Sequence, residues 1–521
     1  MNRRTLRTIA VGSALAFVLG ACGQKPGVHV EGGTGGQPLA QGDVAGGTDV
    51  AVDTSGDLDG DGFDDATGAE DLGGTAVADD TGGGSFDAGT TDTSGGTTSG
   101  GDPSGGTTSG GDPSGGDTSG GTTSGGDTSG GDTSGGQQTQ DSGGKKQVTG
   151  SDRTGLTAEK MTFASHAPVT GAAPLPTTSF EKSGDLYWRN LTEIQKKKVL
   201  GRSKVELLFR DDKYDPNSAR QVCRELASKA FTVAGGGGTD QIQACGQFAK
   251  VAEFPYFSAG VTEAGLRDNP WYFAASMSYK QQGPLLAQMV KKNFGGKKVA
   301  AIITDTPNFD DAIAGWEAGV KQQGLNYYKT LRHPKGDTSW YNAFAGDLKA
   351  NGVEVVYILS SPVDYIRFAQ QASQSGIKFQ YVGVGVSMGL NAVLGSGCDE
   401  VDGGMFFSPF PGLDYARKNV PGFFETAKRF NAPADDIAFA LWGQAAVQHD
   451  LLLRYEKTYG PDLTREDFRD LVETQTGIGG EIFPTVNYSP QNHFGSTAVH
   501  LLRADCSKGE YVTVASFAKS F

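Results

Sequence analysis

A five-residue string in the second half of the chain has the spacing of a hydrolase nucleophile. Gly385-Val386-Ser387-Met388-Gly389 matches glycine-x-serine-x-glycine, in which the serine sits on a sharp turn between a strand and a helix. A later acid and a later histidine would complete a triad, and the candidates in the correct order are Asp399, Asp402, His449, His493 and His500. However, no His-Gly-Gly-Gly string is present to form an oxyanion hole, and a chain with 79 glycines produces such short matches by chance. We therefore assign no catalytic residue and keep a serine hydrolase that uses Ser387 as the minor alternative.

An acidic run near the N-terminus has part of the spacing of a calcium loop. Four aspartates stand at positions 1, 3, 5 and 9 of a loop of the EF-hand kind, and they are Asp57, Asp59, Asp61 and Asp65. Position 12, which should be a bidentate glutamate, is Gly68, and no helices flank the loop. An acidic linker is therefore the simpler interpretation. We predict no metal and no cofactor, with these aspartates as a minor calcium candidate.

The N-terminus has the pattern of a secretory signal. Arg3, Arg4 and Arg7 precede an apolar run over residues 9–19, which is too short for a permanent membrane span. The string Leu19-Gly20-Ala21-Cys22 resembles the lipobox of bacterial lipoproteins, and that resemblance implies lipidation of Cys22. We therefore expect a signal peptide over residues 1–21 and an extracytoplasmic protein that is lipid-anchored to the bacterial cell membrane. The alternative is an ordinary signal peptide with a chance cysteine.

Residues 22–155 have the composition of a flexible tether. Residues 92–136 repeat a five-residue unit such as Asp102-Pro103-Ser104-Gly105-Gly106, with almost no apolar side chain to form a core. Between residues 31 and 144 there are 21 acidic and no basic residues, whereas the whole chain has a net charge of −15. The acidity thus belongs to the tether, and no basic patch points to nucleic acid. A glycosylated stalk is the alternative interpretation.

Residues 156–521 alternate strand and helix patterns, which predicts parallel sheets covered on both faces. The expected strands are 161–165, 205–210, 231–234, 256–259, 299–304, 353–359 and 381–385. The expected helices are 217–229, 241–251, 282–293, 310–323, 340–351 and 363–375. A length of about 365 residues exceeds one ordinary core, so we expect two lobes. Ligands of such folds bind at the carboxyl ends of strands.

Several ordered strings resemble the type I periplasmic binding proteins of the branched-chain amino-acid-binding kind. They begin at Phe163, Phe209, Phe257 and Ile302, and each combines an apolar strand with a polar loop. The resemblance implies an α/β fold of two doubly wound lobes with parallel central sheets, joined by a three-stranded hinge. Lobe one would comprise 156–280 and 411–484, and lobe two 281–410 and 485–521. The resemblance also implies that the protein is a binding protein rather than an enzyme. Such a protein captures a small-molecule ligand between the lobes and delivers it to an ABC permease. A sensor subunit of the same fold is the alternative.

The resemblance also implies a set of ligand-binding residues. In lobe one, Thr239 or Asp240, with Gly260, Val261 and Thr262, would hold a carboxylate or another strongly polar group. In lobe two, Phe309 and the loop from Ser360 through Ser361 to Pro362 would close on the rest of the ligand. The first ligand loop contributes Gly171 and Ala172, and Tyr279 would lie on the hinge side. The family's ammonium-binding acid should follow the strand that ends at Gly385, where this chain has no carboxylate, so an α-amino-acid ligand is in doubt.

With Cys22 lipidated, four cysteines remain, and an oxidising compartment allows three possible pairings. The lobe assignment favours Cys223–Cys245 within lobe one and Cys398–Cys506 within lobe two. Each disulfide would then leave the hinge free to move.

Overall fold

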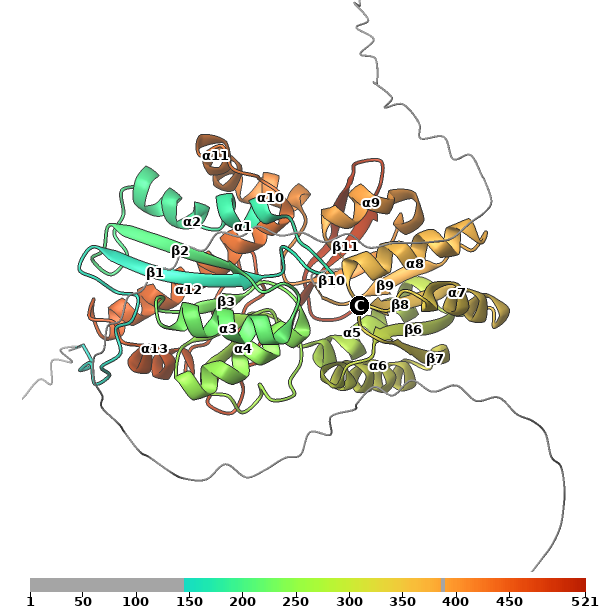
Figure 1. Cartoon of the computed structure of the whole chain (residues 1–521), viewed down its shortest axis with the longest axis horizontal. Helices are drawn as coiled ribbons and strands as arrows, with labels where there is room; N and C mark the ends of the chain where they lie inside the picture. The colour runs from blue at the N-terminus through green and yellow to red at the C-terminus, as the bar shows by residue number, and fades with distance from the viewer. Residues whose placement is uncertain (1–144, 386–388) are drawn as a thin grey trace, which may run out of the picture. The chain divides into compact units, whose positions relative to one another are not determined.

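The computed structural model describes residues 145–385 and 389–521, and these form two lobes that lie side by side, each built on its own sheet (Figure 1). The predicted α/β architecture of two lobes is confirmed. Cys22, the calcium candidates Asp57, Asp59, Asp61 and Asp65, and Ser387 lie outside the described residues. Among the residues described, no helix is long and apolar enough to cross a membrane.

Lobe one contains a five-stranded parallel sheet with the order β2-β1-β3-β4-β5. Its strands are β1 (Lys160–Ala167), β2 (Lys204–Asp211), β3 (Val233–Gly235), β4 (Tyr256–Ser258) and β5 (Tyr272–Ala274). Alternate side chains of a strand point to opposite faces. Ala164 accordingly packs in one core, with α3 (Pro216–Ala227) and α4 (Thr239–Ala252), while Phe163 packs in another. That second core contains α1 (Thr177–Ser183), α2 (Leu186–Arg189), α12 (Asp436–Thr458) and α13 (Arg465–Val472).

Lobe two contains a seven-stranded sheet with the order β12-β11-β10-β9-β8-β6-β7. Its strands are β6 (Lys298–Thr304), β7 (Asn326–His333), β8 (Val355–Leu359), β9 (Gln380–Gly383), β10 (Met405–Ser408), β11 (Val499–Asp505) and β12 (Glu510–Ala518). One face is covered by α5 (Tyr279–Phe294) and α6 (Asp310–Gln323), and the other by α7 (Trp340–Ala350), α8 (Pro362–Gln374) and α9 (Asn391–Val401). The sequence analysis expects parallel strands, but β11 and β12 are antiparallel because a short turn joins them into a hairpin.

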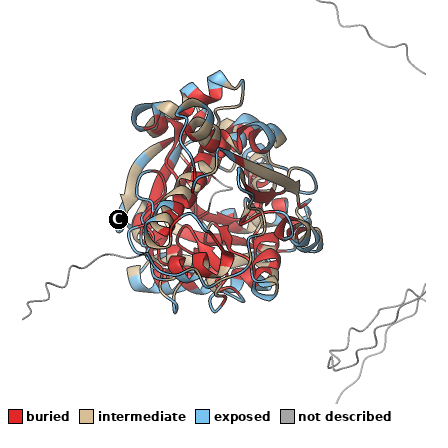
Figure 2. Ribbon diagram, turned by 90° about the vertical axis from the view of Figure 1, so that its left-hand side faces the viewer, coloured by how far each residue is buried: buried red, intermediate tan, exposed pale blue. Residues whose placement is uncertain are grey.

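The remaining short elements are a π-helical turn (Asn190–Ile194), a 3₁₀ turn (Pro307–Phe309), α10 (Leu413–Asn419) and α11 (Pro421–Arg429). Local sequence explains where the longer helices begin. Asp215 caps α3 by accepting a hydrogen bond from the Ser218 N–H, and Pro216 follows at the position where a missing N–H costs little. In Figure 2 the buried residues lie mainly in the interior of the ribbon, and the exposed residues lie mainly at its periphery.

The chain passes between the lobes three times: from β5 to α5, from β10 to α10, and before β11. The segment before β11 lies against lobe one, where the Ala274 N–H donates to the His493 carbonyl (3.0 Å) and the Tyr488 hydroxyl donates to the Ala274 carbonyl (3.0 Å). The third passage therefore comes later than the predicted boundary at residue 485, because this segment covers the edge strand of the lobe-one sheet.

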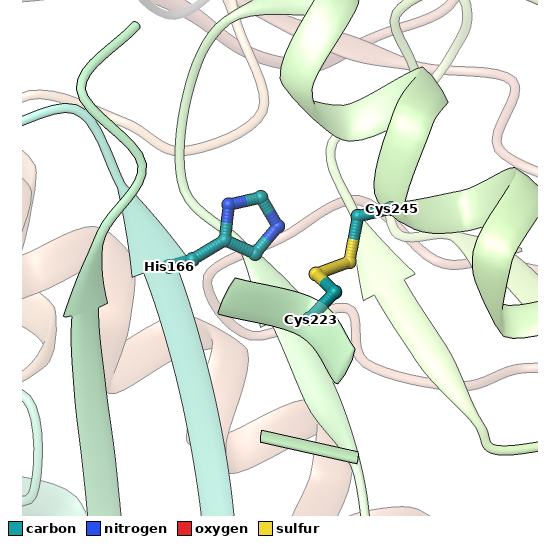
Figure 3. Close-up of side chains that lie close together, drawn as sticks. All are labelled: His166, Cys223 and Cys245. Carbon is teal, nitrogen blue, oxygen red and sulfur yellow. A yellow bond between two sulfur atoms is a disulfide. The ribbon is translucent and has the colours of Figure 1, made fainter. Parts of the chain in front are cut away.

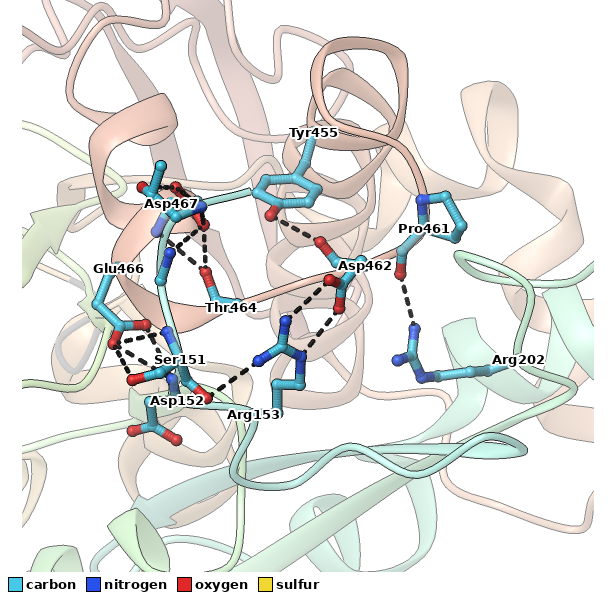
Figure 4. Close-up of polar contacts among 12 residues, drawn as sticks. Ser151, Asp152, Arg153, Arg202, Tyr455, Pro461, Asp462, Thr464, Glu466 and Asp467 are labelled. Carbon is cyan, nitrogen blue, oxygen red and sulfur yellow. Dashed lines mark hydrogen bonds and ion pairs between the residues drawn. The ribbon is translucent and has the colours of Figure 1, made fainter. Parts of the chain in front are cut away.

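A short segment before the first strand binds to lobe one, and we call residues 146–153 the strap (Figure 4). The backbone N–H groups of Thr149 and Gly150 donate to the Asp467 carboxylate at 3.0 and 2.8 Å. The Asp152 carboxylate accepts a hydrogen bond from Arg465 (2.9 Å). The sequence analysis places these residues in the tether because they are polar. The structured part of the chain instead begins before residue 156, since the strap satisfies polar groups at the start of α13.

Both expected disulfides are present, so the predicted pairing is confirmed: Cys223–Cys245 joins α3 to α4, and Cys398–Cys506 joins α9 to the β11–β12 turn. His166 lies beside the first of them (Figure 3). These three residues come close enough to share a metal ion, but the disulfide has consumed the thiolates that a metal would need. The two ring nitrogens of His166 contact Asp212 and the Tyr256 hydroxyl, each at 2.8 Å.

Candidate ligand-binding cleft

A cavity lies between the lobes at the carboxyl ends of strands from both sheets. Pro168 follows β1, Gly238 follows β3, Ser360 follows β8 and Val384 follows β9, and all four line it. Its volume, counted as space open to the centres of water molecules, is about 40 Å³. Of the residues that the sequence analysis names, the lining includes Thr239, Asp240, Tyr279, Phe309, Ser360, Ser361 and Pro362.

An ion pair joins the two lobes at this cavity. Asp240, in the first turn of α4, accepts a hydrogen bond at one carboxylate oxygen from the Lys335 ammonium of lobe two. Its other oxygen accepts one from the Asn308 amide, also of lobe two. The Lys335 ammonium lies 4.2 Å from the centre of the Tyr214 ring, which adds a cation–π contact. Asp240 is thus fully engaged by lobe two in this closed arrangement.

Two helices present their N-termini to the cavity. Thr239 is the first residue of α4, and Ser361 is the N-cap of α8; both line the cavity. The Ser361 hydroxyl accepts a hydrogen bond from the Asp364 N–H (3.1 Å). A helix N-terminus carries a partial positive charge and unpaired N–H donors, which favour an anion. At α8, however, Pro362 has no N–H and Ser361 already satisfies the Asp364 N–H, so α4 offers more donors than α8. The Lys335 ammonium also lines the cavity; Asp240 balances its charge, but an ammonium has three N–H donors and the ion pair with Asp240 does not use them all. The combination can bind a carboxylate or another anionic group.

A partly buried hydrogen-bond network positions the two serines of lobe two. The Ser360 hydroxyl lies 2.9 Å from His333 Nε2 and 3.0 Å from the Asp364 carboxylate, which also accepts from the Ser361 hydroxyl (2.7 Å). Burial lowers the pKa of His333, so its imidazole is neutral near pH 7. His333 Nδ1 faces the Pro334 carbonyl at 3.1 Å rather than a carboxylate. The cluster therefore lacks the acid–histidine contact that activates a serine nucleophile.

Aromatic side chains form another wall of the cavity. The rings of Tyr279 and Phe309 stack with centroids 6.2 Å apart and planes 10° from parallel. Burial raises the pKa of Tyr279 to about 12, so its hydroxyl keeps its proton and can donate a hydrogen bond. Gly385 does not line the cavity but supports this wall from behind, because a Cβ there would come within 2.8 Å of the Tyr279 ring. Gly385 also has a φ of 89°, which few other residues adopt.

The other expected site residues lie outside the cavity lining. Gly171 and Ala172 are exposed. The Gly260 N–H donates to the Ser276 hydroxyl at 2.9 Å, and the Val261 carbonyl accepts from the Tyr279 N–H. Thr262 is fully buried, with its hydroxyl 3.2 Å from the Asp311 carboxylate. These residues are therefore left out of the site proposed below.

The loop that contains Thr262 holds the lobes together instead. Asp311, at the start of α6 in lobe two, also accepts a hydrogen bond from the Glu263 N–H at 2.6 Å. Burial raises the pKa of Asp311, although these two hydrogen bonds oppose the increase. A third contact between the lobes is the Asn391 N–H of lobe two, which donates to the Asp436 carboxylate of α12 at 2.6 Å. The described conformation is thus a closed one, stabilised by several polar contacts across the cleft.

The cavity-lining residues that were not predicted include Lys335, Tyr214 and Leu175. A cation directly after a strand was the available signal for Lys335, since β7 ends at His333. Tyr214 belongs to the turn after β2, and Leu175 to the loop between β1 and α1. The loop of Leu175 was expected at the cleft, but through Gly171 and Ala172 rather than through Leu175.

The histidines considered for a hydrolase have other roles. His449 contacts the Tyr187 hydroxyl (2.8 Å), His493 Nδ1 contacts the Tyr272 carbonyl (2.8 Å), and His500 Nε2 contacts the Ile482 carbonyl (3.0 Å). Among the candidate acids, the Asp402 carboxylate accepts from the Cys506 N–H (3.0 Å). Each of these three histidines therefore makes a contact other than one to a candidate catalytic acid.

Comparison with known proteins agrees with this fold. The family model described as "Periplasmic binding protein" matches residues 162–510, and the chain belongs to that family. A curated relative, "Leu/Ile/Val-binding protein homolog 7" of Brucella suis biovar 1, is 29% identical over 188 residues, which are 33% of this chain and 46% of the relative. The chain thus spans about half the length of the curated relatives that it matches.

Solved structures of the same architecture include solute-binding proteins of ABC transporters. The "fatty acid ABC transporter substrate-binding protein" of Thermomonospora curvata superimposes with a TM-score of 0.59 at 17% identity, over 71% of this chain and 95% of that one. A leucine-binding protein of Thermotoga maritima superimposes with a TM-score of 0.56 at 16% identity, over 68% of this chain and 98% of that one. At such identities the likeness establishes the fold, and the family is one of binding proteins.

Proposed function

We propose that this protein is the solute-binding subunit of an ABC importer and that its solute is a small carboxylate-bearing or strongly polar molecule without a free ammonium. The observation that best supports this proposal is that the Asp240 carboxylate is already bound by other side chains. Asp240 is the one acidic residue among the described residues that line the cavity, and Asn308 and Lys335 occupy its carboxylate. An α-ammonium group would find no free carboxylate there, whereas an anion would meet the N-terminus of α4 and the N–H donors of Lys335 that Asp240 does not use.

Within this proposal each side of the cleft has a defined part. Thr239 and the first N–H groups of α4 bind the anionic group from lobe one. Lys335, Ser360 and Ser361 bind polar atoms from lobe two, and the Tyr279–Phe309 wall packs against carbon. Because residues of both lobes contact the same solute, the solute favours the closed arrangement over an open one. A permease would then receive the closed, loaded form.

The location follows from the N-terminal sequence. We infer that the signal peptide is removed, that Cys22 carries lipid, and that the acidic linker lets the lobes move away from the membrane while staying attached. Replacement of Cys22 by alanine would test this inference, because the variant should lose incorporation of labelled palmitate. Equal labelling of the variant and the wild type would contradict lipidation at this residue.

The ligand proposal is tested with a thermal-shift screen of small carboxylic acids, followed by calorimetric titration of the acids that raise the melting temperature. Loss of a hydrogen bond to a charged group weakens binding by about 10- to 150-fold, so Lys335→Met should reduce affinity for a bound acid by that factor. Lys297→Met is the matched control, because Lys297 pairs with Glu354 (3.5 Å) and does not line the cavity. Equal losses in both variants, or no loss in Lys335→Met, would contradict the assignment of the anion site.

A further inference from the structure

A second cavity lies beside the cleft, mainly against lobe one, and we call it the apolar chamber; Leu390, which precedes α9 of lobe two, also lines it. It is bounded by the lobe-one sheet, α1 and α12, and its volume, counted in the same way as for the cleft cavity, is about 90 Å³. The sheet side is open because the residues at the strand ends are small: Ala234, Gly235, Gly236, Ala259 and Ala275. A water molecule needs about 10–15 Å³ of such space, so the chamber could hold several waters or one small ring.

The walls of the chamber are apolar apart from two side chains. Phe180, Phe410 and Leu441 are among the described lining residues, and the polar side chains among them are Ser165 and Gln444. The Ser165 hydroxyl and the Gln444 Nε2 are buried and have no hydrogen-bond partner among the described residues. Ser165 is only 3% exposed. A buried polar group without a partner is costly. These two line the same chamber, where a polar atom of a ligand or a water can supply the missing hydrogen bonds.

The chamber adjoins the cleft cavity at one side chain. Leu175 lines both spaces. It is half-buried and packs close to Gly237, where an added Cβ would lie 3.4 Å from Leu175 Cδ1. Joining the polar cavity to the apolar chamber at this point requires the Leu175 side chain to move. An elongated molecule could then have its charged end in the cleft and its carbon body under α12.

We propose that the apolar chamber binds the carbon body of the solute and that this body carries a hydroxyl or carbonyl oxygen. That oxygen would accept a hydrogen bond from the Gln444 amide and share one with the Ser165 hydroxyl. The solute class is therefore a carboxylic acid with an apolar body of about ring size and an oxygen at its far end. The carboxylate part of this inference rests on the proposed function, whereas the chamber can be tested without it.

The test uses two neutral probes, 4-methylphenol and toluene, which share an apolar body and differ by one hydroxyl. Titrations followed by NMR or by calorimetry should show that the protein prefers 4-methylphenol by about 3- to 10-fold, the worth of one neutral hydrogen bond. In Gln444→Leu this preference should disappear. The same substitution should raise the melting temperature of the ligand-free protein, because it removes a buried donor that has no partner.

Gln448→Leu is the matched control, one turn further along α12. Its amide donates to the Thr232 hydroxyl at 3.2 Å, so this variant should melt at a lower temperature and keep the preference for 4-methylphenol. Ala440→Phe fills the chamber and should weaken binding of both probes by at least about tenfold through lost apolar contact. If Ala440→Phe does not fold, the Gln444→Leu and Gln448→Leu pair still decides the question.

The outcomes separate the chamber from the anion site. If Lys335→Met and Gln444→Leu each weaken the binding of 3-(4-hydroxyphenyl)propanoate, the result supports both the anion site and the chamber. If acids bind with the same affinity to the wild type, Gln444→Leu and Ala440→Phe, the chamber does not bind the solute, and the proposed function still stands. Binding of 4-methylphenol that depends on Gln444, with no acid bound, supports the chamber and contradicts the anion site. Absence of binding by both neutral probes overturns the chamber.

Discussion

Asp152 of the strap should contribute more to stability than any exposed ion pair near it. The Arg465 side chain is 4% exposed and donates to the carbonyls of Ala227, Ala230 and Phe231. Asp152 is its carboxylate partner at 2.9 Å. Asp152→Ala would leave a buried guanidinium without a counter-charge.

The magnitude follows from the exposure of the pair. Removing one partner of a fully buried pair costs about 3–5 kcal/mol, and a hydrogen bond to a charged group is worth about 1.5–3 kcal/mol. The Asp152 side chain is 35% exposed, so water can partly replace it, and the lower range applies. We expect Asp152→Ala to lower the free energy of unfolding by about 2 kcal/mol. With an unfolding entropy of about 2.1 cal/mol/K per residue, that loss lowers the melting temperature by about 2–4 °C.

Urea unfolding followed by circular dichroism measures this loss, and Asp462→Ala is the control. Asp462 pairs with Arg153 of the same strap at 2.8 Å, but the two side chains are 57% and 44% exposed, so its loss should cost about 0.5 kcal/mol. Equal effects of the two substitutions would refute the argument from burial. The difference should also depend on pH. Burial opposes the shift, yet hydrogen bonds from Thr154 and the charge of Arg465 hold the pKa of Asp152 below its ordinary value. The stabilisation is therefore present at neutral pH and lost as pH falls below about 4.

Three further predictions follow from the site and the core. Leucine, isoleucine and valine should bind weakly or not at all, and a micromolar dissociation constant for any of them in calorimetry would show that a carboxylate is available to their ammonium. Burial raises the pKa of Asp436 to about 6, so the folded state binds more protons than the unfolded state between about pH 4 and 6, and stability should fall across that range as pH rises. Asp436→Asn should reduce this dependence of the unfolding free energy on pH, measured by urea unfolding at several pH values. An unchanged dependence would show that other groups cause it. The Cys398–Cys506 disulfide closes a loop with a sequence separation of 108 residues. The double variant Cys398→Ala/Cys506→Ala should therefore lose up to about 4–5 kcal/mol of unfolding free energy. An unchanged urea midpoint would show that the disulfide does not constrain the unfolded chain.

Prediction from sequence succeeded where a local pattern has one structural solution. The apolar run around Phe163 has the length and composition of a buried strand, and Asp215 followed by Pro216 is a favoured way to begin a helix. Antiparallel β11 and β12 were missed because β12 is half-exposed and lacks the continuous apolar run of a buried parallel strand. The strap was missed for a related reason, since its polar residues have no local partner and bind only to α13.

The candidate site divides in the same way. Thr239 and Ser360 follow strands, and the carboxyl ends of parallel strands meet at one edge, so their place in the cleft could be predicted. Thr262 also follows a strand, but its side chain turns to Asp311 rather than to the cavity. The direction of a loop side chain depends on the lobe that closes over it, and the sequence does not encode that contact locally.

The sequence by itself determined the division into an acidic linker and an α/β binding domain, because composition alone decides whether a segment can bury a core. It also determined the family, through strands and loops that occur in a fixed order. Only the tertiary structure decided that Asp240 pairs with Lys335, 95 residues further along the chain, and that Ser165 and Gln444 share one apolar chamber. Such pairings depend on how two lobes and a long helix pack in space. The charge that a ligand meets is therefore a property of the closed fold.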